Sequence, residues 1–272
     1  MTNILAFAGK KKAGKNALCN FLHGYHLKSF NIIDGFEITD KGKLIIDTLV
    51  TDEKGETKQG KGMIDVTRTD IDFAMWAMDN LWPFVKHYAF ATPLKEIAMG
   101  LFNIPRENLF GTDEQKNAIS QYNWEDMPTK VKGKSGPMTY REFMQYFGTN
   151  ICRKIYSEVW TRRAIADIKA EEPLYAMISD ARFPNEIEAV QKVGGKVIKL
   201  TGGVDTDSHD SEIALDNYDG YDAVIDTKNQ TIQESCQSVL EIMDSWGWLA
   251  KEIIIPKPET AKINRESFTN IK

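Results

Sequence analysis

The chain of 272 residues is 42% hydrophobic and 27% charged, and its formal net charge is −5. These values predict one large globular domain with insertions and argue against a broad basic surface for duplex nucleic acid. Apolar runs are shorter than the roughly 18 residues of a membrane helix, and the first residues lack the pattern of a signal peptide, so we expect a cytoplasmic protein without a membrane partner.

The first predicted elements surround a glycine-containing loop. Residues 3–8 have the apolar run of a buried strand, and residues 16–22 repeat apolar side chains at helical spacing. Between them lies the G-x-x-x-x-G-K spacing of a phosphate-binding loop, in which backbone N–H groups and a lysine surround phosphate oxygens. A lysine-rich surface turn is the alternative. The phosphate-binding interpretation includes Gly9, Lys12, Ala13, Gly14, Lys15, Asn16 and Ala17.

Asn16 stands where this motif has a serine or threonine hydroxyl. Its amide oxygen can still contact a magnesium ion or one of the ion's waters, because Mg²⁺ takes oxygen ligands and keeps much of its hydration shell. We therefore expect a metal and nucleotide site with Asn16 as one metal ligand.

The next segments predict an insertion and then a return to the sheet. Residues 31–66 alternate β-rich runs with turn signals, which predicts a small antiparallel β insertion. Residues 85–91 are typical of a sheet strand and residues 93–102 of a helix, which places Lys95 in the first turn at the ligand edge of the sheet. We expect residues 103–170 to form a helical substrate-binding or lid region.

Two sets of side chains recur every fourth residue after position 138. Thr139 and Glu142 make a capping box at the start of this helix. An apolar set predicts a buried stripe, formed by Phe143, Phe147, Ile151 and Ile155. A polar set on another ridge forms either a solvated face or a surface that reads a base edge and a phosphate, and it contains Arg141, Gln145, Thr149 and Arg153.

Trp160 and two arginines follow this helix. Trp160 is interpreted either as a core residue or as a stacking platform for the substrate. One of the arginines, for which we select Arg163 over Arg162, is expected to stabilise charge during phosphoryl transfer.

Residues 174–200 have the pattern of a strand, a helix and a second strand. The first strand ends in Asp180, and Pro184 opens the helix. In a parallel sheet Asp180 would lie beside the phosphate loop and hold magnesium waters, and Arg182 would contact a phosphate in a bidentate manner. The alternative makes Asp180 a helix cap and Arg182 its surface partner.

Residues 222–226 and 231–243 predict a last strand and a last helix. The order of elements predicts an α/β fold with a P-loop NTPase-type parallel sheet flanked by helices, a small antiparallel β insertion and a helical substrate region. We expect one domain over residues 1–250 and a polar tail over residues 251–272.

Six stretches, in this order, resemble the bacteriophage deoxynucleoside monophosphate kinases of the P-loop nucleoside monophosphate kinase group. They are GKKKAGKN at 9–16, ATPLKE at 91–96, MQYFGT at 144–149, the segment around Trp160, DAR at 180–182 and HDSE at 209–212. The resemblance implies a deoxynucleoside monophosphate (dNMP) acceptor, ATP as donor, Mg²⁺, often a homodimer, and the host cytoplasm for a phage enzyme. It assigns acceptor binding to Lys95, Gln145, Thr149, Arg153 and Arg182, to which we add Trp160. The role of residues 209–212 stays open between a helix start and a loop near the nucleotide.

The expected mechanism is direct in-line transfer, with Lys15, Asp180, Arg182 and Arg163 as catalytic residues and Asn16 and Asp180 as metal ligands. One alternative is another small-molecule kinase, similar to dephospho-coenzyme A kinase. The other is a regulatory protein that binds a nucleotide without catalysis. The sequence lacks an N-K-x-D guanine-reading motif, which argues against a GTPase.

Overall fold

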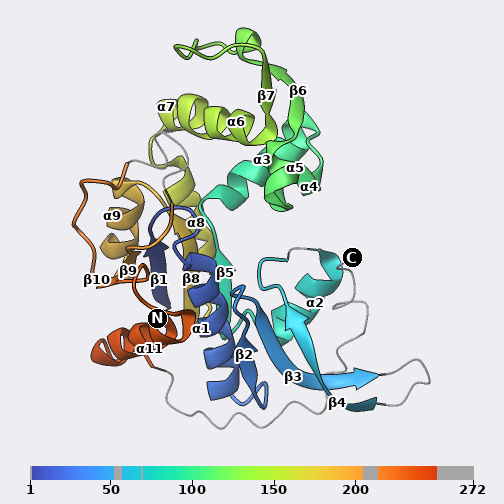
Figure 1. Cartoon of the computed structure of the whole chain (residues 1–272), viewed down its shortest axis with the longest axis vertical. Helices are drawn as coiled ribbons and strands as arrows, with labels where there is room; N and C mark the ends of the chain where they lie inside the picture. The colour runs from blue at the N-terminus through green and yellow to red at the C-terminus, as the bar shows by residue number, and fades with distance from the viewer. Residues whose placement is uncertain (1, 52–56, 69, 205–213, 250–272) are drawn as a thin grey trace.

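A computed structural model describes residues 2–51, 57–68, 70–204 and 214–249. Its centre is a five-stranded parallel sheet with the strand order β10-β9-β1-β8-β5 (Figure 1). The strands are β1 (Asn3–Ala8), β5 (Val85–Tyr88), β8 (Tyr175–Ala181), β9 (Lys196–Leu200) and β10 (Ala223–Ile225). The predicted α/β fold with a parallel sheet is confirmed.

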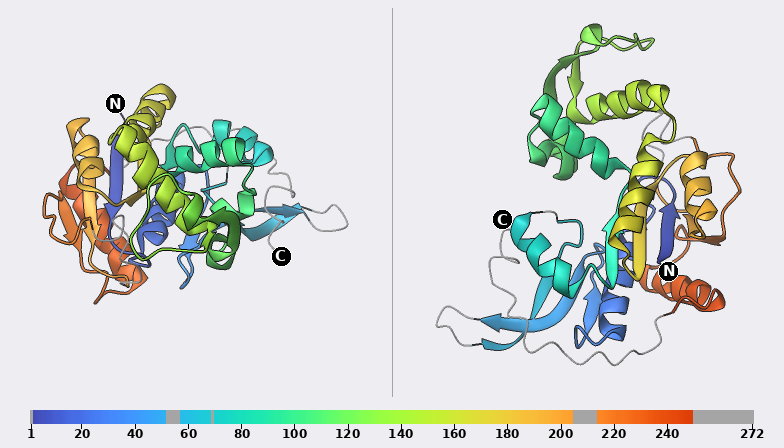
Figure 2. Two further views of the ribbon diagram at one scale, coloured as in Figure 1. Left: turned by 90° about the horizontal axis from the view of Figure 1, so that it is seen from above. Right: turned by 180° about the vertical axis from the view of Figure 1, so that it is seen from behind.

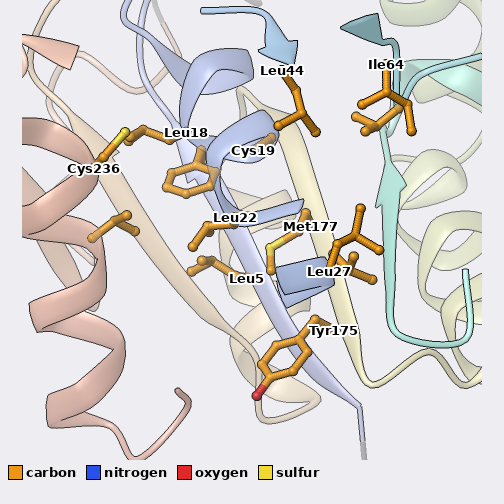
Figure 3. Packing of buried hydrophobic residues seen from close by; sticks show 14 of the residues in the cluster. Leu5, Leu18, Cys19, Leu22, Leu27, Leu44, Ile64, Tyr175, Met177 and Cys236 are labelled. Carbon is orange, nitrogen blue, oxygen red and sulfur yellow. The ribbon is translucent and has the colours of Figure 1, made fainter. Parts of the chain in front are cut away.

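Helices cover both faces of this sheet. Helices α1 (Lys15–Ser29) and α11 (Ile232–Ser245) pack on one face, and α8 (Val159–Glu171) and α9 (Pro184–Lys192) pack on the other. Alternate residues of β1 belong to two separate cores, with Leu5 and Phe7 towards α1 and α11, and Ile4, Ala6 and Ala8 towards α8 and α9. A strand that is buried on both faces in this way carries the continuous apolar run seen in the sequence. Figure 3 shows Leu18 and Leu22 of α1 packed with Leu5 and Met177 of the sheet.

The carboxyl ends of β1 and β8 form the switch point of the sheet. The chain leaves β1 through α1 and reaches β5 at one edge, whereas it leaves β8 through α9 and reaches β9 on the other side of β1. Crevices at such points are where open α/β sheets bind their ligands. The phosphate loop follows β1, and Arg182 follows β8.

The predicted β insertion is present as a three-stranded antiparallel sheet. It contains β2 (Phe36–Ile38), β3 (Leu44–Thr51) and β4 (Thr57–Ile64), and α2 (Ile71–Asn80) follows it. The turn between β2 and β3 contacts the first two turns of α1: a Cβ at Gly42 would lie 2.6 Å from Ala17 Cβ, and Asn20 Nδ2 donates a hydrogen bond of 2.7 Å to Gly42 O. The insertion therefore packs next to the phosphate loop.

Residues 91–157 form a body that we call the helical arm, with a core of its own. Figures 1 and 2 show the arm at one end of the molecule and the three-stranded sheet at the other. The helices of the arm are α3 (Ala91–Phe102), α4 (Arg106–Phe110), α5 (Asp113–Asn117), η1 (Trp124–Asp126), α6 (Tyr140–Gln145), η2 (Tyr146–Cys152) and α7 (Arg153–Ile155), and its strands are β6 (Ile119–Asn123) and β7 (Pro137–Thr139).

The arm corrects two sequence predictions. The segment η2 is a π-helix, whose wider turn breaks the four-residue period of the predicted apolar stripe. Phe143 is buried and Phe147 and Ile151 are partly buried, but Ile155 is 81% exposed. Helix α3 also begins at Ala91, two residues earlier than predicted, so Lys95 lies in its second turn rather than its first.

Candidate active site

A cleft of about 1890 Å³ opens at the switch point. The phosphate loop, the ends of β5 and β8, and the inner side of the helical arm line it. Twelve Lys or Arg residues and eight Asp or Glu residues take part in this lining, whereas the whole chain is acidic. The cleft is therefore a cationic site within an acidic protein, as the binding of phosphorylated ligands requires.

The backbone of the phosphate loop has the conformations that its glycines allow. Gly9 and Gly14 have φ values of 143° and 97°, in the region that favours glycine. A Cβ at Gly9 would lie 2.7 Å from the carbonyl oxygen of Leu200. Helix α1 begins directly after Gly14, so the loop leads into a helix N-terminus that faces the cleft.

Lys15 lies at the centre of this loop. Its ammonium donates hydrogen bonds to Gly9 O at 2.6 Å and to Lys10 O at 2.7 Å. Burial and the nearby charge of Arg182 lower the pKa of Lys15 to about 8, although Asp180 opposes the shift. The ammonium is thus held by neutral carbonyl oxygens beside the start of α1, where a bound anion would neutralise its charge.

Asp180 caps a helix in this structure. Its Oδ1 and Oδ2 accept hydrogen bonds from the N–H groups of Phe90 (2.8 Å) and Ala91 (3.0 Å), at the start of α3. Asp180 is therefore a helix cap, as the alternative interpretation of the sequence stated, and the helix that it caps is α3. Asp180 also lines the cleft close to Lys15, and Asn16 lies exposed at the cleft in the first turn of α1.

Arg153 is neutralised by an acidic residue that the sequence analysis missed. Its guanidinium forms an ion pair with the buried carboxylate of Glu186 and lies 3.8 Å from the centre of the Phe183 ring. Glu186 Oε2 also accepts the backbone N–H groups of Arg182 and Phe183. Burial raises the pKa of Glu186, and Arg153 opposes this. The sequence signal for Glu186 was its place as the third residue of the helix that begins at Pro184, where an acidic side chain typically accepts N–H groups at the helix start.

The other predicted acceptor residues line the same cleft. Gln145 and Thr149 reach it from α6 and η2. Lys95 lies with its ammonium 4.6 Å from the centre of the Phe110 ring, and burial together with the neighbouring Lys116 lowers its pKa to about 8. Trp160 is a core residue, 5% exposed, whose indole N–H donates to Gly148 O at 3.3 Å.

Arg163 and Asp113 each form ion pairs at the cleft. The Arg163 side chain is 62% exposed and pairs with Asp167, four residues along α8. Its role in catalysis stays a prediction. Asp113, which the sequence analysis did not select, lies between Lys11 and Arg141 at the cleft. Residues 209–212 and 251–272 lie outside the described residues.

Two features are absent from the described ranges. No helix there is long and apolar enough to cross a membrane. No group of three or more His, Cys, Asp and Glu side chains gathers there as a candidate metal site.

A glycine-containing loop at the switch point of a parallel sheet, facing a cationic cleft, is consistent with the fold of a P-loop kinase. The family model for deoxynucleotide monophosphate kinase matches residues 3–239. The chain is also 29% identical, over 163 residues, to a protein of Acanthamoeba polyphaga mimivirus named "Putative deoxynucleotide monophosphate kinase"; the match covers 58% of this chain and 82% of the viral protein. The chain therefore belongs to the deoxynucleotide monophosphate kinase family, and it is an enzyme. The deoxynucleoside monophosphate kinase family predicted from the sequence is confirmed.

Proposed function

We propose that this enzyme transfers the terminal phosphoryl group of ATP directly to the phosphate of a deoxynucleoside monophosphate. The position of Lys15 is the observation that carries the proposal. Its ammonium sits among loop carbonyls at the head of α1, next to the charges of Asp180 and Arg182. From there it reaches the terminal phosphates of a nucleotide whose phosphate chain lies in the loop.

The transfer needs no covalent enzyme intermediate. An oxygen of the acceptor phosphate forms a bond to the terminal phosphorus of ATP while the bond to the ADP oxygen breaks. The acceptor is already anionic, so catalysis rests on positioning and on neutralising charge rather than on a general base. Lys15 and Arg182 supply positive charge at the switch point, and Arg163 supplies it from α8.

Asn16 and Asp180 are the residues that would hold Mg²⁺. One amide oxygen and one carboxylate are hard oxygen donors, and the Asp180 oxygens that accept N–H bonds from Phe90 and Ala91 keep lone pairs for the waters of the ion. Bound there, the ion would neutralise charge on the phosphates. The two residues would orient it through its waters, while Asp180 also fixes the start of α3.

The acceptor would lie between the sheet and the helical arm. Lys95 and Arg182 supply charge for its phosphate, and Gln145 and Thr149 supply hydrogen bonds for its base or sugar. Arg153 and Trp160 form the wall behind them, since Glu186 already balances Arg153 and the protein core encloses Trp160. From the family resemblance we expect the enzyme to form a homodimer and to act in the cytoplasm of a phage-infected host.

An acceptor panel tests this function. The purified protein is mixed with ATP, Mg²⁺ and each of the four dNMPs, with the ribonucleotides and dephospho-coenzyme A as comparison acceptors. ADP and the nucleoside diphosphate are measured together. Equal amounts of ADP and deoxynucleoside diphosphate support the proposal. ATP binding without transfer to any dNMP contradicts it and favours another acceptor or a regulatory role.

A further inference from the structure

One carboxylate joins the phosphate loop to the helical arm. Asp113 Oδ2 lies 2.7 Å from Lys11 Nζ, and Asp113 Oδ1 accepts a hydrogen bond of 2.7 Å from Arg141 Nη2. Lys11 belongs to the phosphate loop, whereas Asp113 opens α5 and Arg141 lies in the first turn of α6. The contact therefore bridges two parts of the molecule that face each other across the cleft.

The three side chains project from well-held backbone. Capping boxes fix the starts of α5 and α6, which carry Asp113 and Arg141, and these two helices pack together. On the other side, Lys11 O accepts a hydrogen bond of 3.0 Å from Val204 N. Asp113 and Arg141 therefore belong to one packed part of the arm, and the pair of Lys11 and Asp113 links that part to the phosphate loop, whereas Asp180 and the pair of Arg153 and Glu186 join other parts of the arm to the sheet.

The Asp113 carboxylate offsets the positive charges of the cations around it. Hydrogen bonds from Lys11 and then from Arg141 lower the pKa of Asp113 to about 2, so the carboxylate is ionised at neutral pH. Lys116 is near enough for its pKa to be lowered by burial and by the charges of Arg141 and Lys11. Without the carboxylate, cations from the loop and from the arm would repel each other across the cleft.

We propose that Asp113 is a positioning residue, which holds Lys11 and Arg141 side by side on the path of the phosphates and holds the arm against the phosphate loop before a nucleotide arrives. The inference rests on the proposed function, because both cations line the cleft in which the phosphates would lie. A site that is assembled only part of the time binds its ligand more weakly, in proportion to the assembled fraction. Loss of Asp113 should therefore weaken nucleotide binding.

If Asp113 had no positioning role, its removal would strengthen nucleotide binding instead of weakening it. The loss of a negative charge near a phosphate site makes the local electrostatic potential more favourable for an anion. The sign of the change in affinity thus separates the two roles. Asp113→Asn removes the charge, Asp113→Glu keeps a carboxylate that can bridge, and Glu114→Gln is the matched control, since Glu114 is the next exposed acid in the same turn of α5.

Binding and kinetics with ATP give the first readout. Asp113→Asn should raise the Kd and KM for ATP roughly fivefold, the factor that corresponds to about 1 kcal/mol, and should change kcat by less than about twofold because bound nucleotide still closes the arm. Asp113→Glu should keep the Kd and KM for ATP close to the wild-type values. Glu114→Gln should leave both values unchanged or lower them. An unchanged or lower Kd in Asp113→Asn would overturn the inference.

The distance between the arm and the sheet gives a second readout that needs no turnover. Spin labels at Glu107→Cys in α4 and Lys192→Cys in α9, both exposed, are introduced with Cys152→Ser, since Cys19 and Cys236 are buried. Without nucleotide, the wild type and Asp113→Glu should give one narrow distance distribution, and Asp113→Asn a broader and longer one. Identical distributions in all three would refute the positioning role. Absence of transfer to any dNMP would instead count against the proposed reaction alone.

Discussion

Arg153 and Glu186 form a buried ion pair, and the same carboxylate accepts the backbone N–H groups of Arg182 and Phe183. One acidic side chain thus fixes the turn that carries Arg182 to the switch point and balances the charge of a second arginine. The pair joins the junction of η2 and α7 in the arm to α9, the helix that packs on the sheet. It therefore fixes one side of the cleft.

Glu186→Ala should destabilise the fold by about 3–5 kcal/mol, because it leaves a buried guanidinium without its partner and removes the acceptor of two N–H groups. Urea unfolding measures the change. Glu188→Ala, on the exposed side of the same helix, is the control and should stay within about 0.5 kcal/mol of the wild type. Equal stabilities of the two variants would contradict this account of Glu186.

Activity should fall as the pH rises through about 8. Lys15 and Lys95 both have pKa values lowered to about 8, mainly by burial, and only their protonated forms attract phosphate. The free-enzyme pKa values appear in kcat/KM, so kcat/KM for ATP should report Lys15 and kcat/KM for the acceptor should report Lys95. Bound phosphates favour the charged ammonium, so kcat itself should hold to higher pH.

Profiles of both kcat/KM values between pH 6 and 10 check this prediction. Lys95→Met should remove the fall from the acceptor profile and keep it in the ATP profile. A flat wild-type ATP profile to about pH 9.5 would show that Lys15 keeps the ordinary pKa of a lysine.

Arg182→Ala should lower kcat/KM for the acceptor by roughly 100-fold to 1000-fold, the effect of removing one charge-stabilising donor, with a much smaller change in the Kd for ATP. Equal losses for both substrates would argue against an acceptor role.

Arg163→Ala tests the other arginine. A role in stabilising the transferred charge predicts a fall of roughly 1000-fold or more in kcat. A near-normal kcat would leave Arg163 as the surface partner of Asp167.

Gly42→Ala should destabilise the contact between the β insertion and α1. Gly42 has a φ of 71°, and its added Cβ would lie 2.6 Å from Ala17 Cβ. Gly133→Ala is the matched control, since Gly133 has a φ of 78° and open space around it. Both variants should lose about 1 kcal/mol to backbone strain, and Gly42→Ala about 1–3 kcal/mol more to overpacking. Equal losses in urea unfolding would show that the close approach has no cost.

Local patterns in the sequence were sufficient to predict the sheet and its loop. The apolar run of residues 3–8, the glycines at 9 and 14, and the strand and helix signals around Pro184 depend on neighbours in the chain. The β insertion was predicted for the same reason, because turns punctuate its strands.

Features set by distant contacts were not predicted. The π-helix η2 shifts Ile155 out to solvent, and a four-residue period cannot anticipate the extra residue in its turn. The partner of Arg153 comes from 33 residues away, and Asp113 meets Lys11 from across the cleft. Asp180 was predicted at the correct edge of the sheet, but the helix that it caps begins some 90 residues earlier in the chain.

Turnover by Lys15→Ala is the measurement that tests the central claim most directly. ADP and deoxynucleoside diphosphate are assayed for this variant and the wild type with the best dNMP, and circular dichroism and urea unfolding establish that the variant is folded. We predict acceptor-dependent formation of both products by the wild type and none above background by a folded Lys15→Ala. Wild-type turnover by the folded variant would contradict the assignment of Lys15 and of the phosphate loop as the site of transfer.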